Sequence, residues 1–341
     1  MSSASSCSKD GEMRGNVRRR SLLGALGAGL LAPRLLFAQD AKTRTVAVLF
    51  AGDSEDDEPS LRPFFAKMAR LGWLEGKNVA YDRHSGKGTR EFLATMASTA
   101  AGREPDLIYA TSASIAAAVL KETDSLPVVF ATVADPVAAG LVASLAKPGR
   151  NATGAYLASG DAFAKRFALV RQALPQVKRM GAVFDRGAPD YRGRRAAHEK
   201  AARAAGLALV SAEFTNFEAI AKIFAQFRRD KLIAAEITPS FALIGRRLEV
   251  ATLAARNDIA LIAHRAEWAE AGAVLSYGAD VGEAHRRAAQ IADRILRGAK
   301  PSAIAVQQVR KYELVVNNRV ASALGFHIPK AFLQRAHRVI N

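Results

Sequence analysis

Short apolar runs rich in β-branched residues alternate with helix-forming stretches along most of the chain. The runs lie at 45–50, 78–81, 106–110, 128–130, 180–184, 207–211, 232–236, 259–263 and 273–278. Continuous apolar runs of this length are typical of strands buried on both faces. Their alternation with helices predicts parallel sheets covered by helices on both sides, and 341 residues are enough for two such domains.

The stretch 128–156 indicates how the two halves are joined. A strand is predicted at 128–130, and Asp135-Pro136 then supplies a helix N-cap and first helical position. We expect this helix to end near Lys147-Pro148-Gly149. The small residues that follow, at 151–154, predict a passage from one half of the chain to the other.

Two crossings define the expected domains. The first is predicted at Asn151, Thr153 and Gly154, and the return at Tyr277 and Gly278. Lobe 1 is therefore expected to comprise residues 44–153 plus 276–304, and lobe 2 residues 154–275 plus 305–341. The fold class is α/β, with two Rossmann-like lobes and a ligand cleft between them.

The first 38 residues have the pattern of an export signal. A basic start precedes an apolar stretch at 22–32, which is too short to span a bilayer, and Ala38 offers a cleavage point. Arg19-Arg20-Ser21-Leu22-Leu23 resembles a twin-arginine motif. We predict export to the periplasm with cleavage near Ala38. No Cys follows the apolar stretch, so no lipid anchor is expected; a basic tail on a cytoplasmic protein is the less favoured alternative.

The formal charge of +17 does not by itself indicate a nucleic-acid-binding protein. Without residues 1–38 the chain has 43 basic and 30 acidic residues, and the basic ones are spread over many helices. No zinc finger, leucine zipper or aromatic RNA-binding motif accompanies them. The single Cys7 excludes a disulfide framework and a cysteine-built metal site. We therefore expect a solvated basic surface, no nucleic-acid partner, no metal and no cofactor.

Several segments, taken in order, resemble the tryptophan/tyrosine-type substrate-binding proteins of ABC transporters, which are periplasmic type I solute-binding proteins. They include residues 71–78, 127–130, 135–137, 140–145, 151–154, 275–278, 294–298, 311–317 and 323–329. The resemblance implies capture of a small molecule between the lobes, closure about the hinges, and delivery to an inner-membrane permease with its ATPase. The turns at 185–187 and 238–240 depart from the family pattern, so the family's ligand is not carried over.

Candidate ligand-binding residues lie where predicted strands end, because ligands of open α/β sheets bind at the carboxyl ends of the strands. They are Asp53, Ser54, Thr111, Ser112, Ala113, Asp135, Asp185, Thr238, Ser240, His264 and Trp268. The hydroxyls and N–H groups at 111–114 suit a carboxylate, although an ordinary N-cap is an equal explanation. Asp135 suits an ammonium or caps a helix; His264 and Trp268 have structural roles as alternatives. The predicted ligand is a small amino-acid-like or carboxylated molecule.

The sequence disfavours two other classes of function. An enzyme is disfavoured because the chain has no Gly-x-Ser-x-Gly elbow, no His-Glu-x-x-His and no Walker loop. No catalytic residue is predicted. A ligand-sensing module of the lac-repressor type is disfavoured by the export signal. A periplasmic ligand-sensing partner of a membrane receptor remains the alternative function.

Overall fold

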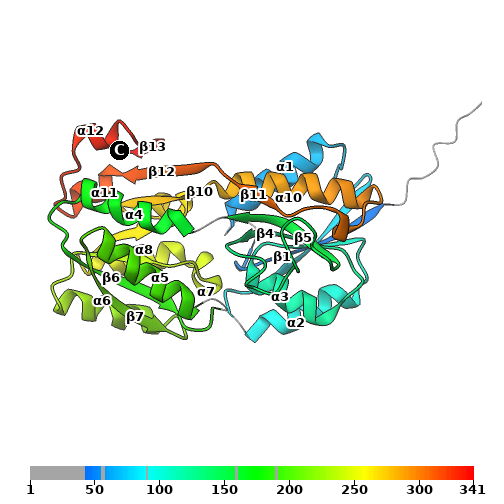
Figure 1. Cartoon of the computed structure of the whole chain (residues 1–341), viewed down its shortest axis with the longest axis horizontal. Coiled ribbons are helices and arrows are strands. Elements are labelled where there is room, and N and C mark those ends of the chain that lie inside the picture. The colour runs from blue at the N-terminus through cyan, green and yellow to red at the C-terminus, as the bar shows by residue number, and fades with distance from the viewer. Residues whose placement is uncertain (1–42, 55–57, 90, 158–159, 189–190) are drawn as a thin grey trace, which may run out of the picture. The chain divides into compact units, whose positions relative to one another are not determined.

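The computed structural model describes residues 43–54, 58–89, 91–157, 160–188 and 191–341. The export signal predicted at 1–38 lies outside these residues. Residues 42–341 form one compact unit that contains two β-sheets, each with helices on both faces (Figure 1).

The first sheet has six strands in the order β11-β5-β4-β3-β1-β2, and all neighbours are parallel. The strands are β1 (Arg44–Phe50), β2 (Val79–Ser85), β3 (Leu107–Ala110), β4 (Val128–Val133), β5 (Ala152–Leu157) and β11 (Gln307–Val309). Its helices are α1 (Arg62–Arg70), α2 (Glu91–Gly102), α3 (Ala113–Glu122) and α10 (Val281–Leu296), with 3₁₀ turns η2 (Pro59–Leu61) and η3 (Pro301–Ala303). We call this sheet with its helices the first lobe.

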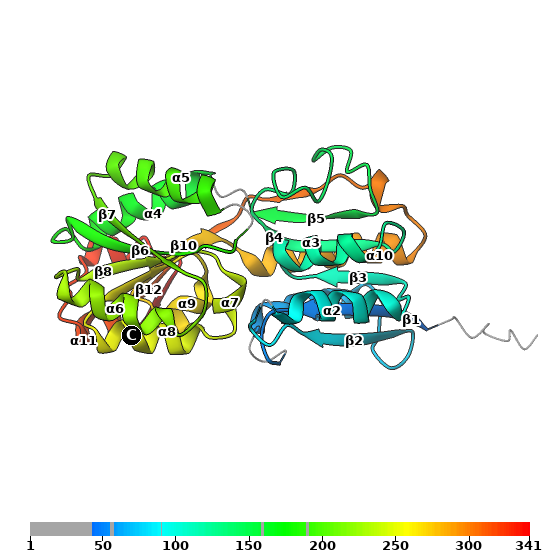
Figure 2. The same ribbon diagram turned by 90° about the horizontal axis from the view of Figure 1, so that it is seen from below.

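Side-chain alternation along β1 explains why both faces of the first sheet are covered. Val46 and Val48 pack in a cluster with α1 and α10, whereas Ala47 and Leu49 pack with α2 and α3. Successive side chains of a strand point to opposite faces, so an unbroken apolar run requires a helix layer on each side. Figure 2 shows α2 and α3 lying over one face of the strands.

The second sheet has seven strands in the order β13-β12-β10-β9-β8-β6-β7, with only β10 and β12 antiparallel among the described pairs. The strands are β6 (Arg179–Asp185), β7 (Ala208–Phe214), β8 (Ala234–Ile237), β9 (Ala260–Ala263), β10 (Leu275–Ala279), β12 (Tyr312–Asn317) and β13 (Arg338–Ile340). The helices are α4 (Gly160–Ala173), α5 (Tyr191–Ala204), α6 (Ala219–Arg229), α7 (Phe241–Ile244), α8 (Arg247–Arg256), α9 (Ala266–Glu270), α11 (Asn318–Ala323) and α12 (Lys330–Leu333). We call this sheet with its helices the second lobe.

The chain leaves the first sheet later than the sequence predicts. Residues 152–157 form β5, which pairs with β4, so the crossing lies between Leu157 and the start of α4. Asn151 and Thr153 are fixed within the first lobe, because Asn151 donates to Leu126 O at 2.8 Å and Thr153 Oγ1 donates to Ile304 O at 2.7 Å. Gly154 is needed there for packing, since a Cβ would lie 2.1 Å from Phe130 O.

The return crossings also differ from the expected boundaries. Tyr277 and Gly278 belong to β10 of the second sheet, and the chain re-enters the first lobe after Asp280, where α10 begins. It then adds β11 beside β5 and crosses again before β12. Residues 305–341, predicted to lie wholly in the second lobe, are therefore shared between the two sheets.

The helix predicted after Asp135 is absent. Residues 136–149 form successive turns, in which Gly140 and Gly149 have φ of 69° and 74°. Both glycines adopt left-handed backbone angles that interrupt a right-handed helix. The N-cap signal was correct only locally, because Asp135 Oδ1 accepts hydrogen bonds from Val137 N at 3.0 Å and Ala138 N at 2.9 Å.

Candidate ligand-binding site

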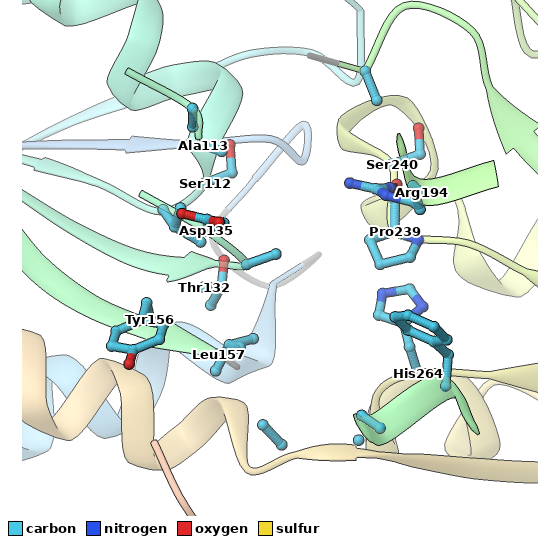
Figure 3. A pocket seen from close by; sticks show the side chains of 18 of the residues that line it. Ser112, Ala113, Thr132, Asp135, Tyr156, Leu157, Arg194, Pro239, Ser240 and His264 are labelled. Carbon is cyan, nitrogen blue, oxygen red and sulfur yellow. Dashed lines mark hydrogen bonds between the residues drawn. The ribbon is translucent and has the colours of Figure 1, made fainter. Parts of the chain in front are cut away.

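A cavity of about 580 Å³ lies at the carboxyl ends of strands from both sheets. In Figure 3, Ser112, Thr132 and Asp135 of the first lobe face Arg194 and His264 of the second across this space. We call the first-lobe residues that line it (112–114, 132–136, 138, 139, 145, 156 and 157) the first wall. The lining residues of the second lobe, on α4, α5, α7 and the ends of β6, β8 and β9, are the second wall.

The N-terminus of α3 forms one part of the first wall. Ser112 is the N-cap, and its Oγ accepts a hydrogen bond from Ile115 N at 3.3 Å. Ala113 and Ser114 follow in the first turn and line the cavity. First-turn N–H groups have no carbonyl partner within the helix, and the helix dipole adds partial positive charge, so this end suits an anion.

An irregularity at the end of β4 forms the next part of the first wall. The pairing of β4 with β5 shifts register between Phe130 and Val133, and Thr132 has φ of 53°. This backbone conformation is strained for a β-branched residue, and such strain is concentrated at functional sites. Thr132 Oγ1 donates to Thr111 O, which stabilises the bulge.

Asp135 follows this bulge and is exposed. Its Oδ1 accepts the two N–H bonds of the following turn, which fix the carboxylate beside the N-terminus of α3 (Figure 3). No cation pairs with Asp135 and no donor bonds its Oδ2 among the residues that the structure describes. The carboxylate therefore retains an oxygen and its negative charge for a ligand.

The second wall contains a group of hydrogen bonds that joins β6 to α5 and α7. Asp185, buried at the end of β6, accepts from Gly187 N at 3.0 Å and from Ser240 Oγ at 2.6 Å. Ser240 is also the N-cap of α7. Arg194 of α5 donates through Nη1 to Pro239 O. These bonds fix the positions of Arg194 and Ser240 at the cavity.

His264 follows β9 and presents its ring to the cavity (Figure 3). Burial lowers the pKa of the imidazole well below its ordinary value, and the nearby charges of Arg166 and Arg265 lower it further. The ring is therefore neutral at pH 7. Nδ1 lies 3.3 Å from Ile237 O, so Nδ1 carries the proton and Nε2 keeps its lone pair.

Three charged or polar side chains form a buried cluster. Two of them belong to the second wall, and the third lies behind it. Arg166 Nε donates to Glu236 Oε1 at 2.9 Å, and His198 Nε2 lies 3.5 Å from the same oxygen. Burial opposes ionisation of Glu236, but the charges and hydrogen bonds of Arg166 and His198 outweigh it and lower its pKa below the ordinary value. The carboxylate is therefore ionised and pairs with the guanidinium at the cavity.

The two lobes also touch directly. Phe241 of α7 is buried in a cluster with Leu49 and Met96 of the first lobe. Arg265 Nη2 donates to Ser60 Oγ at 3.2 Å. Phe241 and Arg265 also line the cavity, so they belong both to the second wall and to the contact between the lobes.

Six of the residues proposed from sequence line the cavity: Ser112, Ala113, Asp135, Asp185, Ser240 and His264. Asp53 and Ser54 are exposed after β1 and are not among the lining residues. Thr111, Thr238 and Trp268 are buried and do not line it either. Thr238 Oγ1 donates to Val183 O at 2.8 Å, and Trp268 packs in the core of the second sheet, so both have structural roles.

Most of the larger side chains at the site were not predicted from the sequence. These are Thr132, Tyr156, Leu157, Phe163, Arg166, Arg194, His198, Phe241 and Arg265. Arg265 is adjacent to the predicted His264 and could have been found from the same strand end. Arg166, Arg194 and His198 lie within helices, where no local signal distinguishes them from surface residues.

Over the described ranges, no three His, Cys, Asp or Glu side chains gather in a way that could hold a metal ion. Within the same ranges no helix has the length and apolar character needed to cross a membrane.

A family model described as ABC transporter substrate binding protein matches residues 46–340. Among curated proteins, a tyrosine-binding protein of Clostridioides difficile is 24% identical over 274 residues, covering 79% of this chain and 78% of that protein.

Two solved structures are similar over most of the chain. A conserved domain protein from Vibrio cholerae has a TM-score of 0.80 and 25% identity, covering 87% of this chain and 100% of that one. The ABC domain from Streptococcus pneumonia, in complex with L-Trp, has a TM-score of 0.80 and 22% identity, covering 88% of this chain and 100% of that one.

Proposed function

Because the family model spans almost all of the described chain, the chain belongs to the ABC transporter substrate binding proteins, and we propose that it captures an amino acid in the periplasm for an ABC importer. Its fold is that of a type I periplasmic binding protein. The inner-membrane permease and its ATPase are the proposed partners. The proposal assigns no chemical reaction to the chain.

The observation that carries the proposal is the pair of opposite charges at the first wall. The N-terminus of α3 suits a carboxylate, and Asp135, held beside it, suits an ammonium. An α-amino acid carries both groups on one carbon. The names of the two relatives that bind tyrosine and L-Trp agree with a ligand of this class.

Lobe closure is the proposed mechanism. The amino-acid head group contacts the first wall and the side chain contacts the second, so the ligand stabilises the arrangement in which both walls are in reach. Two segments that cross between the sheets, at 279–281 and 309–312, are the proposed hinges. Tyr277 and Gly278 lie next to the first of these, whereas Thr153 and Gly154 lie within the first sheet and Asn151 directly precedes its strand β5.

Export through the twin-arginine route and cleavage near Ala38 complete the proposal. A periplasmic partner of a membrane receptor would use the same pocket and closure. Uptake of labelled ligand by cells lacking the protein distinguishes the two functions, since only the importer component is required for uptake.

The first experiment measures thermal unfolding of the purified protein with amino acids, with tyramine, which lacks a carboxylate, and with hydroxyphenylpropionate, which lacks an amino group. We expect an amino acid to raise the midpoint, by about 2.7 kcal/mol of stabilisation at a hundredfold excess over Kd. The two analogues are expected to have little effect. A panel in which both analogues stabilise the protein as well as tyrosine does would contradict the proposed head-group site.

Asp135→Asn sharpens the test because it removes the charge and keeps an oxygen that accepts the turn's N–H bonds. We expect amino-acid affinity to fall by roughly 10- to 100-fold, since a hydrogen bond to a charged group contributes about 1.5–3 kcal/mol. Stability without ligand should change little, in contrast to Asp135→Ala. Asp124→Asn, at an exposed site between α3 and β4, is the matched control and should leave affinity unchanged.

A further inference from the structure

The second wall contains hydrogen-bond donors for which the described residues provide no acceptor. We propose that the Arg166 guanidinium binds an oxygen atom at the far end of the ligand's side chain. The ligand is then an amino acid whose side chain ends in an oxygen acceptor, not a hydrocarbon one. This inference rests on the proposed function, because it assumes that the amino-acid head group lies at the first wall.

Arg166 uses only some of its N–H groups in hydrogen bonds with the described residues. A guanidinium has five N–H groups. Nε–H donates to Glu236 Oε1 at 2.9 Å, and one hydrogen of Nη1 goes to Tyr277 O at 3.1 Å. In the part of the chain that the structure describes, the other N–H groups have no acceptor. Most of the donor capacity of this side chain is therefore unused.

The unused N–H groups of Arg166 lie at the cavity. The Arg166 side chain is only 4% exposed, yet it lines the cavity. Its remaining accessible surface therefore faces the cavity. Because the unused N–H groups reach the cavity, water can satisfy them in the free protein, and an oxygen atom of a ligand can take the place of that water.

The Arg166 guanidinium is held in a fixed orientation, and its charge is balanced. Glu236 and the Tyr277 carbonyl hold the guanidinium from two sides, so its orientation is fixed before a ligand arrives. The ionised Glu236 balances the charge of Arg166. Because this pair is neutral overall, an uncharged oxygen is an adequate acceptor, and a second carboxylate on the ligand is not required.

The surroundings of Arg166 fit the end of a side chain. His198 is 2% exposed and lines the cavity, and its Nε2 lies 3.5 Å from Glu236 Oε1. Its ring stacks on Phe163 with 4.5 Å between centroids. His264, the other titratable group facing this region from β9, is neutral and offers a lone pair. The aromatic rings of Phe163 and His198 and the neutral His264 thus lie near the donors of Arg166, and the charged Arg194 and Arg265 line the same cavity.

The test is calorimetric titration with amino acids that differ only at the end of the side chain. Phenylalanine and tyrosine form one pair; leucine, asparagine and aspartate form an isosteric set. We expect the oxygen-bearing member to bind at least roughly tenfold more tightly within a set, because its acceptor meets a charged donor. Asparagine against aspartate then shows whether a neutral or an anionic oxygen is preferred.

Variants connect any preference to Arg166. Arg166→Met combined with Glu236→Gln removes the donors without leaving a buried charge unpaired. We expect the double variant to bind both members of a pair equally, with the affinity of the hydrocarbon member retained. Lys165→Met, on the exposed face of the same helix, should keep the preference.

The outcomes separate this inference from the proposed function. If amino acids bind but the wild-type protein shows no preference within the sets, the inference is wrong and the proposed function stands. A double variant that keeps the preference overturns it equally. If no amino acid binds, the proposed function fails and the inference with it. The wild-type comparison decides the matter even if the double variant does not fold.

Discussion

The two walls of the cavity are built in different ways. The first wall offers the backbone of a helix N-terminus, a bulged strand end and an exposed carboxylate held by two N–H bonds. The second offers long charged side chains, and one of them, Arg166, is almost completely buried against Glu236. Local turn geometry therefore determines the first wall, whereas the second depends on how helices pack across a sheet. We expect substitutions in the second wall to reduce stability more than substitutions in the first wall. We also expect the two lobes to lose stability in different pH ranges.

The largest expected effect concerns buried titratable groups, which both lobes contain. In the first lobe, Tyr109 OH donates to His285 Nδ1, and burial lowers the pKa of His285 to about 3. The unfolded chain takes up this proton near pH 6.5, and the native state does not. Stability therefore falls as pH decreases from about 6.5 to about 3, by about 1.4 kcal/mol per pH unit from this group.

Urea unfolding at pH 7, 6 and 5 measures this slope. His285→Gln cannot ionise, so we expect its slope to be shallower; His264, whose pKa is also lowered, keeps some dependence. Glu236 acts in a lower range, since its native pKa is below 4.5 and its contribution is lost only as pH falls through that value. Glu236→Gln should therefore leave the slope between pH 7 and 5 unchanged. Equal slopes in wild type and His285→Gln would refute the assignment to the first lobe.

The next largest loss of stability is expected for a second-lobe side chain that packs against the first lobe. Phe241 is 5% exposed and packs in a first-lobe cluster, although α7 is part of the second lobe. We expect Phe241→Ala to reduce the free energy of unfolding by about 3–5 kcal/mol, the range for a buried Phe. Phe92, on α2 and 41% exposed, is the matched control, and its replacement by Ala should have a much smaller effect. Similar losses from both variants would show that the ring is not a core residue.

The smallest effects compare one N-cap serine from each wall. Ser240 caps α7 and also donates to the buried Asp185 carboxylate at 2.6 Å, whereas Ser112 caps α3 only. We expect Ser240→Ala to destabilise by about 2–3 kcal/mol and Ser112→Ala by about 1 kcal/mol. Thermal unfolding of both variants side by side gives the order. A Ser112→Ala loss equal to or larger than that of Ser240→Ala would contradict the proposed difference between the walls.

Much of the fold could be predicted from sequence because its signals are local. The apolar runs at 45–50 and 106–110 correspond closely to β1 and β3. The family and the type I fold were predicted correctly as well. The helix expected after Asp135 was wrong because the cap was given more weight than Gly140, which lies inside the predicted segment and has a left-handed backbone.

The crossings and half of the site could not be predicted, because they depend on contacts distant in sequence. Residues 151–154 have the composition of a linker, and pairing with β4 makes 152–154 part of a strand. Ser112 and Asp135 were found because each follows a strand directly. Arg166 and His198 were not, since their place at the cavity depends on packing against Glu236 of β8, which lies at least 38 residues further along the chain.

The position of α10 has a consequence for the order in which the chain can fold during synthesis. Residues 281–296 complete a core that begins with β1 and α1, and Trp73 Nε1 donates to Asp293 Oδ1 across 220 residues. The first lobe therefore remains incomplete until nearly the whole chain has left the ribosome, whereas most of the second lobe is already available. Contacts between such distant segments slow folding. The lobe that starts the sequence is thus expected to close its core only after most of the second lobe has been synthesised, and residues 312–340 then complete the second lobe.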